Sequence, residues 1–231
     1  MSDRPAAVAL EDLVFGYRPG REVLRIAALS IAAGERVFLH GPSGSGKTTL
    51  LGLTAGVLAP QQGRVKILGQ DLAQLPSSRR DAYRGSHIGY LFQLFNLIPY
   101  LSVLENIALP CRLHAIRRDR LGTTSIEAEA RRLAERLELG EFLTTAVTEL
   151  SVGQQQRVAA ARALIGRPEL VIADEPTSAL DTDLRDRFLE LLFECCDEAG
   201  ATLLFVSHDL SLGARFDRVI SLPTMNTAGG R

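Results

Sequence analysis

The chain has 231 residues, enough for one domain or for a core domain with an insert, and 46% of them are hydrophobic. Its 26 basic and 27 acidic residues give a net charge of −1, which disfavours nucleic acid as a partner; the basic pairs at 79–80 and 117–118 are short enough to be solvated faces. Three cysteines without paired spacing argue against a disulfide framework, and we expect neither a signal peptide nor an apolar run of the roughly 18 residues that span a bilayer.

The first third of the chain predicts mainly strands. Alternating or continuous apolar segments lie at 8–15, 23–31, 35–40, 64–68 and 86–93, the last leading into a loop. The third of these segments continues directly into GPSGSGKTT (41–49), and a helix is predicted from about 47 to 56.

Between about 94 and 166 the pattern becomes helical. Thr124 and Glu127 fit a capping box, followed by a helix with one apolar stripe. A second helix is predicted over 153–167, ended by Gly166 and Pro168.

Strands and helices alternate again after this segment. LVIAD (170–174) is a continuous apolar run, as expected of a parallel strand covered on both faces. A helix over about 182–198 is predicted to place five residues inward: Leu184, Phe188, Leu191, Leu192 and Cys195. Segments 201–208 and 218–222 predict a buried strand and an edge strand. The order predicts an α/β core interrupted by a helical insert.

The stretch GPSGSGKT (41–48) fits the pattern G-x-x-x-x-G-K-[ST] after a strand and before a helix. Its glycines let backbone N–H groups turn toward phosphate oxygens, and the helix N-terminus favours negative charge. Lys47 is expected to reach the β- and γ-phosphates of ATP, and the Thr48 hydroxyl to bind Mg²⁺. The predicted nucleotide-binding residues of this loop are Gly41, Pro42, Ser43, Gly44, Ser45, Gly46, Lys47, Thr48 and Thr49.

Asp174 and Glu175 follow the predicted strand at 170–174. Asp174 is placed to hold Mg²⁺ directly or through water, and Glu175 to orient and polarise an attacking water. The alternative is an acidic pair that caps the next helix. Two adjacent carboxylates at the end of a buried strand are costly without a cation or a proton, which favours the metal interpretation.

LSVGQQQR (150–157), followed by a helix and LVIADEPTSALD (170–181), resembles the ATP-binding-cassette (ABC) ATPase family over almost the whole chain. The resemblance implies that Tyr17 stacks on adenine, Gln93 is the Q-loop glutamine and His208 the switch histidine. It assigns Ser151, Gly153 and Gln154 to the signature and Asp181 to the D-loop. Taken singly, Tyr17, Gln93 and His208 would more often have ordinary structural roles. Their joint occurrence around a complete P-loop favours the functional roles.

The family resemblance also implies the fold: a P-loop NTPase core with a mainly parallel sheet, an N-terminal antiparallel β part and an inserted α-helical subdomain. The chain is then one domain, 1–231. Residues 1–93 and 167–231 would form the RecA-like core, and about 94–166 the helical subdomain with the signature.

In such proteins the signature lies too far from the P-loop of its own chain to touch the nucleotide. A head-to-tail homodimer would place Ser151 and the backbone at 153 on the γ-phosphate bound by the partner, giving two sites at the interface. Val152 stands where the family commonly has glycine. A positive φ there would damage the turn, since valine disfavours it; we expect instead that the position tolerates a side chain.

The expected reaction is ATP + H₂O → ADP + phosphate, with catalytic roles for Lys47, Gln93, Glu175 and His208. The γ-phosphate provides the differential contacts that switching requires. Gln93 would join the site to the helical insert as a hinge, and it is counted with Thr48 and Asp174 among the residues near the metal.

The family mostly energises membrane permeases, so the expected partners are a second copy of the chain and a separate permease that docks near the Q-loop. The apolar residues at 94–104 either form that docking surface or are buried under the helical insert. We expect a cytoplasmic location, peripheral on the inner face of the membrane. FQLFNLIPYLSVLENIALP (92–110) looks most like the lipoprotein-release, macrolide-export and cell-division subfamily, which favours export or extraction. A nucleotide-gated or mechanical regulator and a polar amino acid importer remain alternatives.

Two other classes share part of this pattern. A soluble kinase would need the P-loop but not LSVGQ, SALD and His208 together. A DNA-repair or chromosome ATPase would carry a long coiled coil between Gln93 and the signature, where only 56 residues lie here.

Overall fold

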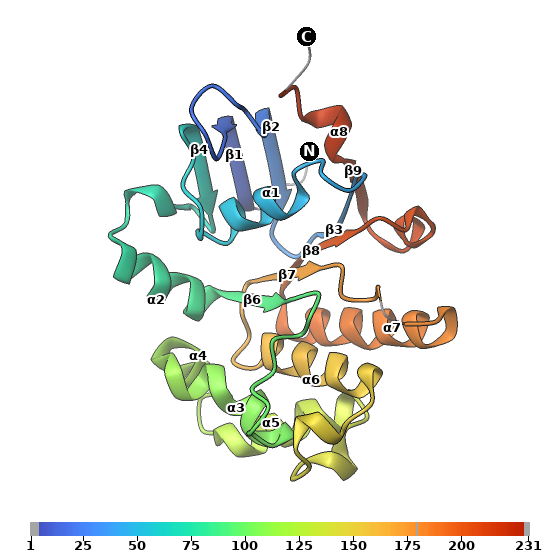
Figure 1. The fold of residues 1–231 in the computed structure, drawn as a ribbon. Coiled ribbons are helices and arrows are strands. Elements are labelled where there is room, and N and C mark those ends of the chain that lie inside the picture. Colours follow the sequence, from blue (N-terminus) through green and yellow to red (C-terminus); the bar gives the residue numbers. More distant parts are fainter. Residues whose placement is uncertain (1–4, 179, 229–231) are drawn as a thin grey trace. The chain divides into compact units, whose positions relative to one another are not determined.

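The structure, a computed structural model, describes residues 5–178 and 180–228. The chain forms two compact units. Met1–Arg84 and Thr202–Arg231 make up the first, and Gly85–Ala201 makes up the second. Each unit contains both strands and helices (Figure 1).

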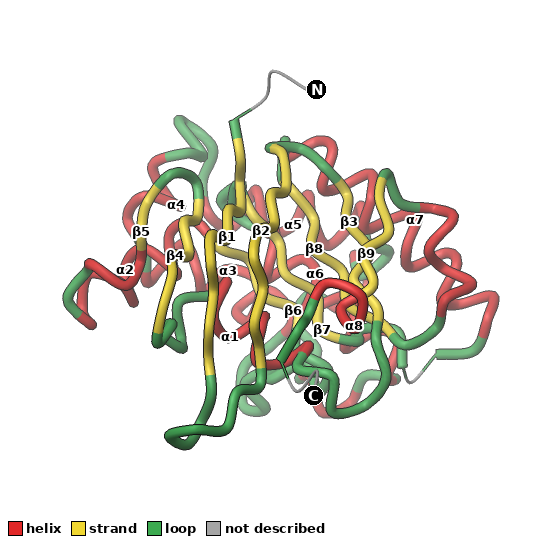
Figure 2. Tube along the Cα trace, turned by 90° about the horizontal axis from the view of Figure 1, so that it is seen from above, coloured by secondary structure: helices red, strands yellow, loops and turns green. Residues whose placement is uncertain are grey.

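The first unit contains an antiparallel sheet with the order β2–β1–β4–β5. Its strands are β1 (Ala6–Phe15), β2 (Leu24–Ala32), β4 (Gln62–Ile67) and β5 (Gln70–Asp71). β1 pairs with β2 on one side and β4 on the other, and the three run side by side in Figure 2. Inward residues alternate with exposed ones along β2, as expected of a sheet with one covered face.

Parallel strands form the other sheet region of this unit, in the order β8 (Thr202–Ser207), β3 (Arg36–His40) and β9 (Arg218–Ser221). Phe38 of β3 packs against Phe205 of β8, with ring centroids 6.2 Å apart, and against Phe216 at 5.3 Å. The helices of this region are α1 (Lys47–Thr54) and α8 (Leu222–Met225), with short 3₁₀ turns at Leu72–Gln74 and Leu210–Arg215. β9 ends the strand order, so the prediction of an edge strand is confirmed.

The second unit pairs β6 (Ile88–Leu91) with β7 (Leu170–Asp174) in parallel. Its helices are α3 (Val103–Leu113), α4 (Ala115–Asp119), α5 (Ile126–Arg136), α6 (Val152–Leu164) and α7 (Thr182–Ala199), with 3₁₀ turns at Gly140–Phe142 and Val147–Glu149. α3 packs against both α5 and α6, and α6 also packs against β6 and α7. The core of α6 is built from small residues, which let its neighbours approach closely.

Two helices lie outside the segments predicted to be helical, namely the four-residue α8 and α2. α2 (Ser77–His87) is polar along nearly its whole length, and only Ser86 is buried, so it has no apolar stripe to reveal it. Because α2 includes Ser86 and His87, the strand predicted from 86 begins only at Ile88. No helix within the described residues is both long enough and apolar enough to cross a membrane.

Three local predictions were wrong. The cap of α5 is Ser125, whose hydroxyl accepts from the Ala128 N–H, so the Thr124–Glu127 capping box does not form. Leu184 of α7 is 51% exposed and Leu191 is only partly buried. The other three residues predicted to face inward are buried, together with Leu189, Phe193 and Cys196.

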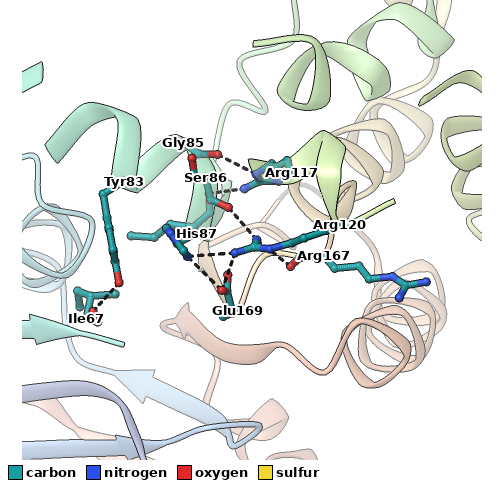
Figure 3. A network of polar contacts seen from close by, with 10 residues as sticks. Ile67, Tyr83, Gly85, Ser86, His87, Arg117, Arg120, Arg167 and Glu169 are labelled. Atoms are coloured by element: carbon teal, nitrogen blue, oxygen red, sulfur yellow. Dashed lines mark hydrogen bonds and ion pairs between the residues drawn. The ribbon is translucent and has the colours of Figure 1, made fainter. Parts of the chain in front are cut away.

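The third is Arg117, which is 2% exposed rather than solvated. Its guanidinium group donates to four backbone carbonyls, those of Gly85, Ile88, Ala163 and Ile165. The bond to Gly85 is drawn in Figure 3. Burial lowers its pKa to about 10. A buried cation satisfied entirely by carbonyl dipoles gives no sequence pattern that distinguishes it from a surface arginine.

Candidate functional site

The glycine-rich loop lies between the end of β3 at His40 and the start of α1 at Lys47. Gly44 and Gly46 have φ values of 78° and 100°, which L-residues adopt only at a cost. Gly46 is the N-cap of α1, and no side chain caps this helix. An uncapped N-terminal turn leaves backbone N–H groups directed at the loop, which is the arrangement that binds phosphate.

Lys47 is largely buried, and its ammonium group bends back onto this loop. Nζ donates to the carbonyl oxygens of Gly41 at 2.8 Å and Pro42 at 3.2 Å. The Ser45 hydroxyl is buried without a hydrogen-bond partner. An added Cβ at Gly41 would lie 2.7 Å from that oxygen, so the loop has no room for a side chain there. A cation and an orphaned hydroxyl in one loop fit an anionic ligand.

Tyr17 lies beside the same helix. Its hydroxyl is 3.1 Å from the Thr49 hydroxyl, and its ring meets Phe15 edge-on. The residue is 64% exposed, so a ring face is available for stacking. Thr48, in the first turn of α1, is also exposed.

His208 is brought to the loop by strand register. β3 and β8 are parallel, and His40 pairs with Ser207. Gly41 and His208 therefore follow neighbouring strands at the same carboxyl-terminal edge, where ligands bind in α/β proteins. His208 is exposed. The first unit thus gathers Tyr17, residues 41–49 and His208.

In the second unit, Asp174 and Glu175 stand at the end of β7. β6 is parallel to β7, with Leu91 paired to Ala173, so Gln93 follows at the same edge as the two carboxylates. Glu175 has a φ of 45°, a left-handed conformation that costs about 1–2 kcal/mol in a non-glycine residue and that concentrates at functional sites. Burial, followed by the negative charge of Asp174, raises the pKa of Tyr90.

The signature turn is a regular helix start. Ser151 is the N-cap of α6: the Gln154 N–H donates to its hydroxyl at 3.3 Å, and its own N–H donates to Gln154 Oε1 at 2.8 Å. Val152 is the first helical residue, lies outside the positive-φ residues and is 48% exposed. The valine therefore neither strains the turn nor fills it, and the Ser151 hydroxyl keeps its hydrogen to donate.

Gly153 faces the D-loop. A Cβ on Gly153 would meet Leu180 at 3.7 Å, and both residues line a pocket of about 290 Å³ with Arg157 and Leu184. Asp181 is exposed and caps α7 by accepting from the Leu184 N–H at 3.0 Å. Ala179, within the predicted SALD stretch, lies outside the described residues.

Sequence reasoning missed the residue that holds the Q-loop. Arg162, in the last turn of α6, donates to the carbonyl oxygens of Phe95 at 2.5 Å and Asn96 at 2.7 Å. These two residues carry positive φ values of 58° and 49°. The asparagine at 96 was a weak signal of that conformation, but nothing in the sequence linked it to an arginine 66 positions away.

Comparison with known proteins identifies the family to which this chain is similar. The sequence model of the ABC transporter family matches residues 24–178. The chain is 43% identical over 202 residues, 87% of this chain and 86% of the relative, to the uncharacterized ABC transporter ATP-binding protein YbbA of Escherichia coli K12. It is 40% identical over 201 residues, 87% and 85% of the two chains, to the lipoprotein-releasing system ATP-binding protein LolD of Shewanella sp. MR-7.

A solved structure agrees. The ATP-binding cassette MJ0796, in a dimeric post-hydrolysis state bound to ADP and Pi, superposes with a TM-score of 0.80 at 35% identity and 93% coverage of both chains. The ABC ATPase fold predicted from the sequence is therefore confirmed: an antiparallel N-terminal sheet, parallel strands and a helical subdomain. This chain belongs to the ABC transporter family, in which it is an ATP-binding subunit and an ATPase.

Proposed function

We propose that two copies of this chain close on ATP and drive a membrane permease, with each nucleotide bound between the P-loop of one copy and the signature turn of the other. The observation that carries the proposal is the start of α6. Ser151 and Val152 are exposed, and the first turn of the helix that Ser151 caps contains no left-handed residue, although Val152 replaces the usual glycine. Such a helix N-terminus with an available hydroxyl suits an anion.

In this proposal the P-loop holds the phosphates of ATP. Lys47 would exchange its bonds to the Gly41 and Pro42 carbonyls for phosphate oxygens, while N–H groups at the start of α1 surround the β-phosphate. Tyr17 would stack on the adenine, since its ring is exposed beside α1. His208, which ends at the same sheet edge as Gly41, would contact the γ-phosphate.

Mg²⁺ would be held by the Thr48 hydroxyl and Asp174, with Gln93 nearby. The described residues contain no group of three or more His, Cys, Asp or Glu side chains arranged for a metal. The fit is therefore to an ion that takes much of its octahedral shell from phosphate and water, as Mg²⁺ does. When bound, the ion would neutralise charge that develops on the phosphate oxygens.

Glu175 would orient the attacking water. Its left-handed backbone follows the last residue of β7, and the Ser178 N–H donates to its carbonyl oxygen at 3.3 Å, which fixes the turn. Such a positioned base contributes about 10²–10⁴ in rate. Glu175→Gln is thus expected to bind ATP without turning it over at a comparable rate.

Light scattering of the Glu175→Gln protein tests the dimer. We expect twice the monomer mass in ATP and the monomer mass in ADP, because only ATP supplies a γ-phosphate for the signature of the partner. Ser151→Ala in the same background is the matched variant and is expected to remain monomeric at the same concentration. A monomer in ATP for Glu175→Gln itself would contradict the proposal.

The permease would dock on a groove beside the Q-loop. A pocket of about 250 Å³ lies there, with Tyr90, Phe92, Leu109 and Leu113 in its wall. Phe92 stacks on Tyr90 with ring centroids 4.2 Å apart, and Leu94 and Tyr100 project from the adjacent loop with more than four-fifths of their surface exposed. Exposed apolar residues around a groove favour a helical partner segment.

For the cargo, the similarity to LolD supports release or extraction of lipoproteins, with this chain bound peripherally on the cytoplasmic face of the membrane. Reconstitution with the permease that copurifies with the chain tests this assignment. ATP-dependent release of a labelled lipoprotein from the vesicles is the expected result, and uptake of a small solute would instead indicate an importer.

A further inference from the structure

The turn that follows Gln93 is strained. Phe95 and Asn96 are consecutive residues in the left-handed region, with φ values of 58° and 49°. Each costs about 1–2 kcal/mol relative to an ordinary conformation. The turn has short local bonds, from the Phe95 N–H to the Phe92 carbonyl and from the Asn96 N–H to the Leu94 carbonyl. A conformation of this cost persists only where its surroundings impose it.

Arg162 supplies that constraint. Its two terminal nitrogens donate separately to the carbonyl oxygens of Phe95 and Asn96, so the fork of one guanidinium group spans both strained residues. No carboxylate among the described residues pairs with it. Burial lowers the pKa of Arg162, as expected of a cation that has exchanged water for these carbonyls.

Arg162 belongs to the helix that begins with the signature. α6 has 13 residues, so its two ends are about 20 Å apart and are joined by one continuous helix. Its C-terminal end is held a second time by Arg117, which donates to the carbonyl oxygens of Ala163 and Ile165. Figure 3 shows the same arginine reaching Gly85, just before β6.

Both arginines also line the groove beside the Q-loop. Arg162 and Asn96 lie in its wall together with Phe92, and Arg117 lies there with His114. A partner segment bound in this groove would therefore contact both the turn that Arg162 holds at Phe95 and Asn96 and the C-terminal end of α6.

We propose that Arg162 is a positioning residue that locks the Q-loop turn to the signature helix, so that the turn and Ser151 move as one body when the groove is occupied. The functional consequence rests on the proposed role of the signature in closing on ATP. The lock itself is a property of the single chain and is present without nucleotide or permease.

Hydrogen exchange of the monomer, followed by mass spectrometry, tests the lock. Arg162→Lys keeps the charge but replaces the planar two-nitrogen fork with a single ammonium nitrogen, and Arg162→Gln removes the charge. In both, we expect amides at 94–97, and those of Gln154 and Gln155 that bond to Ser151, to exchange about tenfold faster, while amides of β6 and β7 keep their parent rates. Arg112→Lys is the control, because Arg112 is an exposed arginine of the same unit that pairs with Glu127.

Faster exchange at 94–97 alone would overturn the inference, because the turn would then loosen without the signature. Equal acceleration in β6 and β7 would also overturn it, since Arg162 would then only stabilise the unit. Where Arg162→Gln does not fold, Arg162→Lys decides the question.

A second measurement addresses the consequence. In the Glu175→Gln background, Arg162→Lys is expected to weaken ATP-dependent dimerisation about tenfold while the affinity of the monomer for a fluorescent ATP analogue stays within about twofold. Unchanged dimerisation would overturn the functional part of the inference. Failure of the Glu175→Gln parent to dimerise would contradict the proposed function alone, because the exchange experiment needs no dimer.

Discussion

The P-loop and the signature turn both end in a helix N-terminus, but they reach it by different backbones. In the P-loop, Gly44 and Gly46 are left-handed and no side chain caps α1. At the signature, Ser151 and Gln154 form a reciprocal capping box, and α6 starts at Val152 with ordinary helical geometry. The P-loop therefore depends on glycine, whereas the signature turn depends on the Ser151 cap.

This difference explains why a valine is acceptable at 152 and would not be at 46. A β-branched residue is excluded from positive φ but fits the first turn of a helix, provided that its side chain points outward. Val152 meets that condition. Glycine at 152 is thus optional for the backbone.

Gly46→Ala is expected to have the largest effect. Its φ of 100° would be strained, and the new Cβ would lie 2.8 Å from Leu24. We expect at least a hundredfold loss of ATP affinity and a loss of roughly 1–3 kcal/mol in unfolding free energy. Calorimetric titration and urea unfolding measure the two.

Gly44→Ala is the matched control, because its φ is 78° but no atom lies within 4 Å of the added Cβ. This variant therefore has an unfavourable positive φ at residue 44 but no steric contact between the added Cβ and another residue. Wild-type ATP affinity in both variants would show that the loop does not depend on left-handed glycine.

Ser151→Ala is expected to come next. Loss of the cap costs about 1 kcal/mol of stability, and loss of the hydroxyl removes a donor proposed for the γ-phosphate of the partner. In the Glu175→Gln background, dimerisation in ATP should weaken at least tenfold, measured by light scattering over a concentration series. Ser151→Thr keeps a capping hydroxyl, so a similar loss in that variant would show that the hydroxyl is not the contact.

Glu138→Gln is expected to have a smaller effect, and one that depends on pH. The carboxylate joins Arg157 of α6 at 2.7 Å to Arg187 of α7, and its pKa is lowered, chiefly by the hydrogen bond from Arg187. A lowered pKa means that the stabilisation is present above the ordinary value of 4.5 and is lost as the pH falls through the lowered value.

Because Glu138 is exposed, its two ion pairs together should contribute less than about 1 kcal/mol. Urea unfolding at pH 7 should show Glu138→Gln slightly below the wild type, and the two proteins should converge as the pH falls below the lowered pKa of Glu138. A difference that grows toward low pH would have the wrong sign for this carboxylate.

Val152→Gly should have the smallest effect. Glycine restores the common residue but lowers helix propensity, so we expect about 0.4 kcal/mol less stability and an ATP-dependent dimerisation constant within about twofold. A tenfold gain in dimerisation would instead mean that the valine impairs the signature and that this turn, like the P-loop, depends on glycine.

Much of the fold could be predicted from the sequence because its signals are local. β7 matches LVIAD, and α6 begins within the signature and ends before Gly166, as the glycine and proline signals indicate. The antiparallel sheet and the order of the parallel strands came instead from the family resemblance. α2 escaped prediction because a polar helix carries no periodic apolar signal.

The candidate site likewise has parts that the sequence predicts and parts that it does not. The loop at 41–49 follows a known pattern, but the clamp made by Arg162 and the burial of Arg117 depend on carbonyls that are distant in sequence. Backbone carbonyls are present at every residue, so a sequence cannot indicate which of them an arginine will find.

Mixing two defective chains tests the central claim most directly. In the Glu175→Gln background, Lys47→Ala lacks a working P-loop and Ser151→Ala lacks a working signature, so each alone should remain monomeric in ATP. Their mixture can form one complete site from the P-loop of one chain and the signature of the other. The account predicts a dimer by light scattering only in the mixture, with one ATP bound for every two chains; a mixture that stays monomeric, or Lys47→Ala dimerising alone, would contradict it.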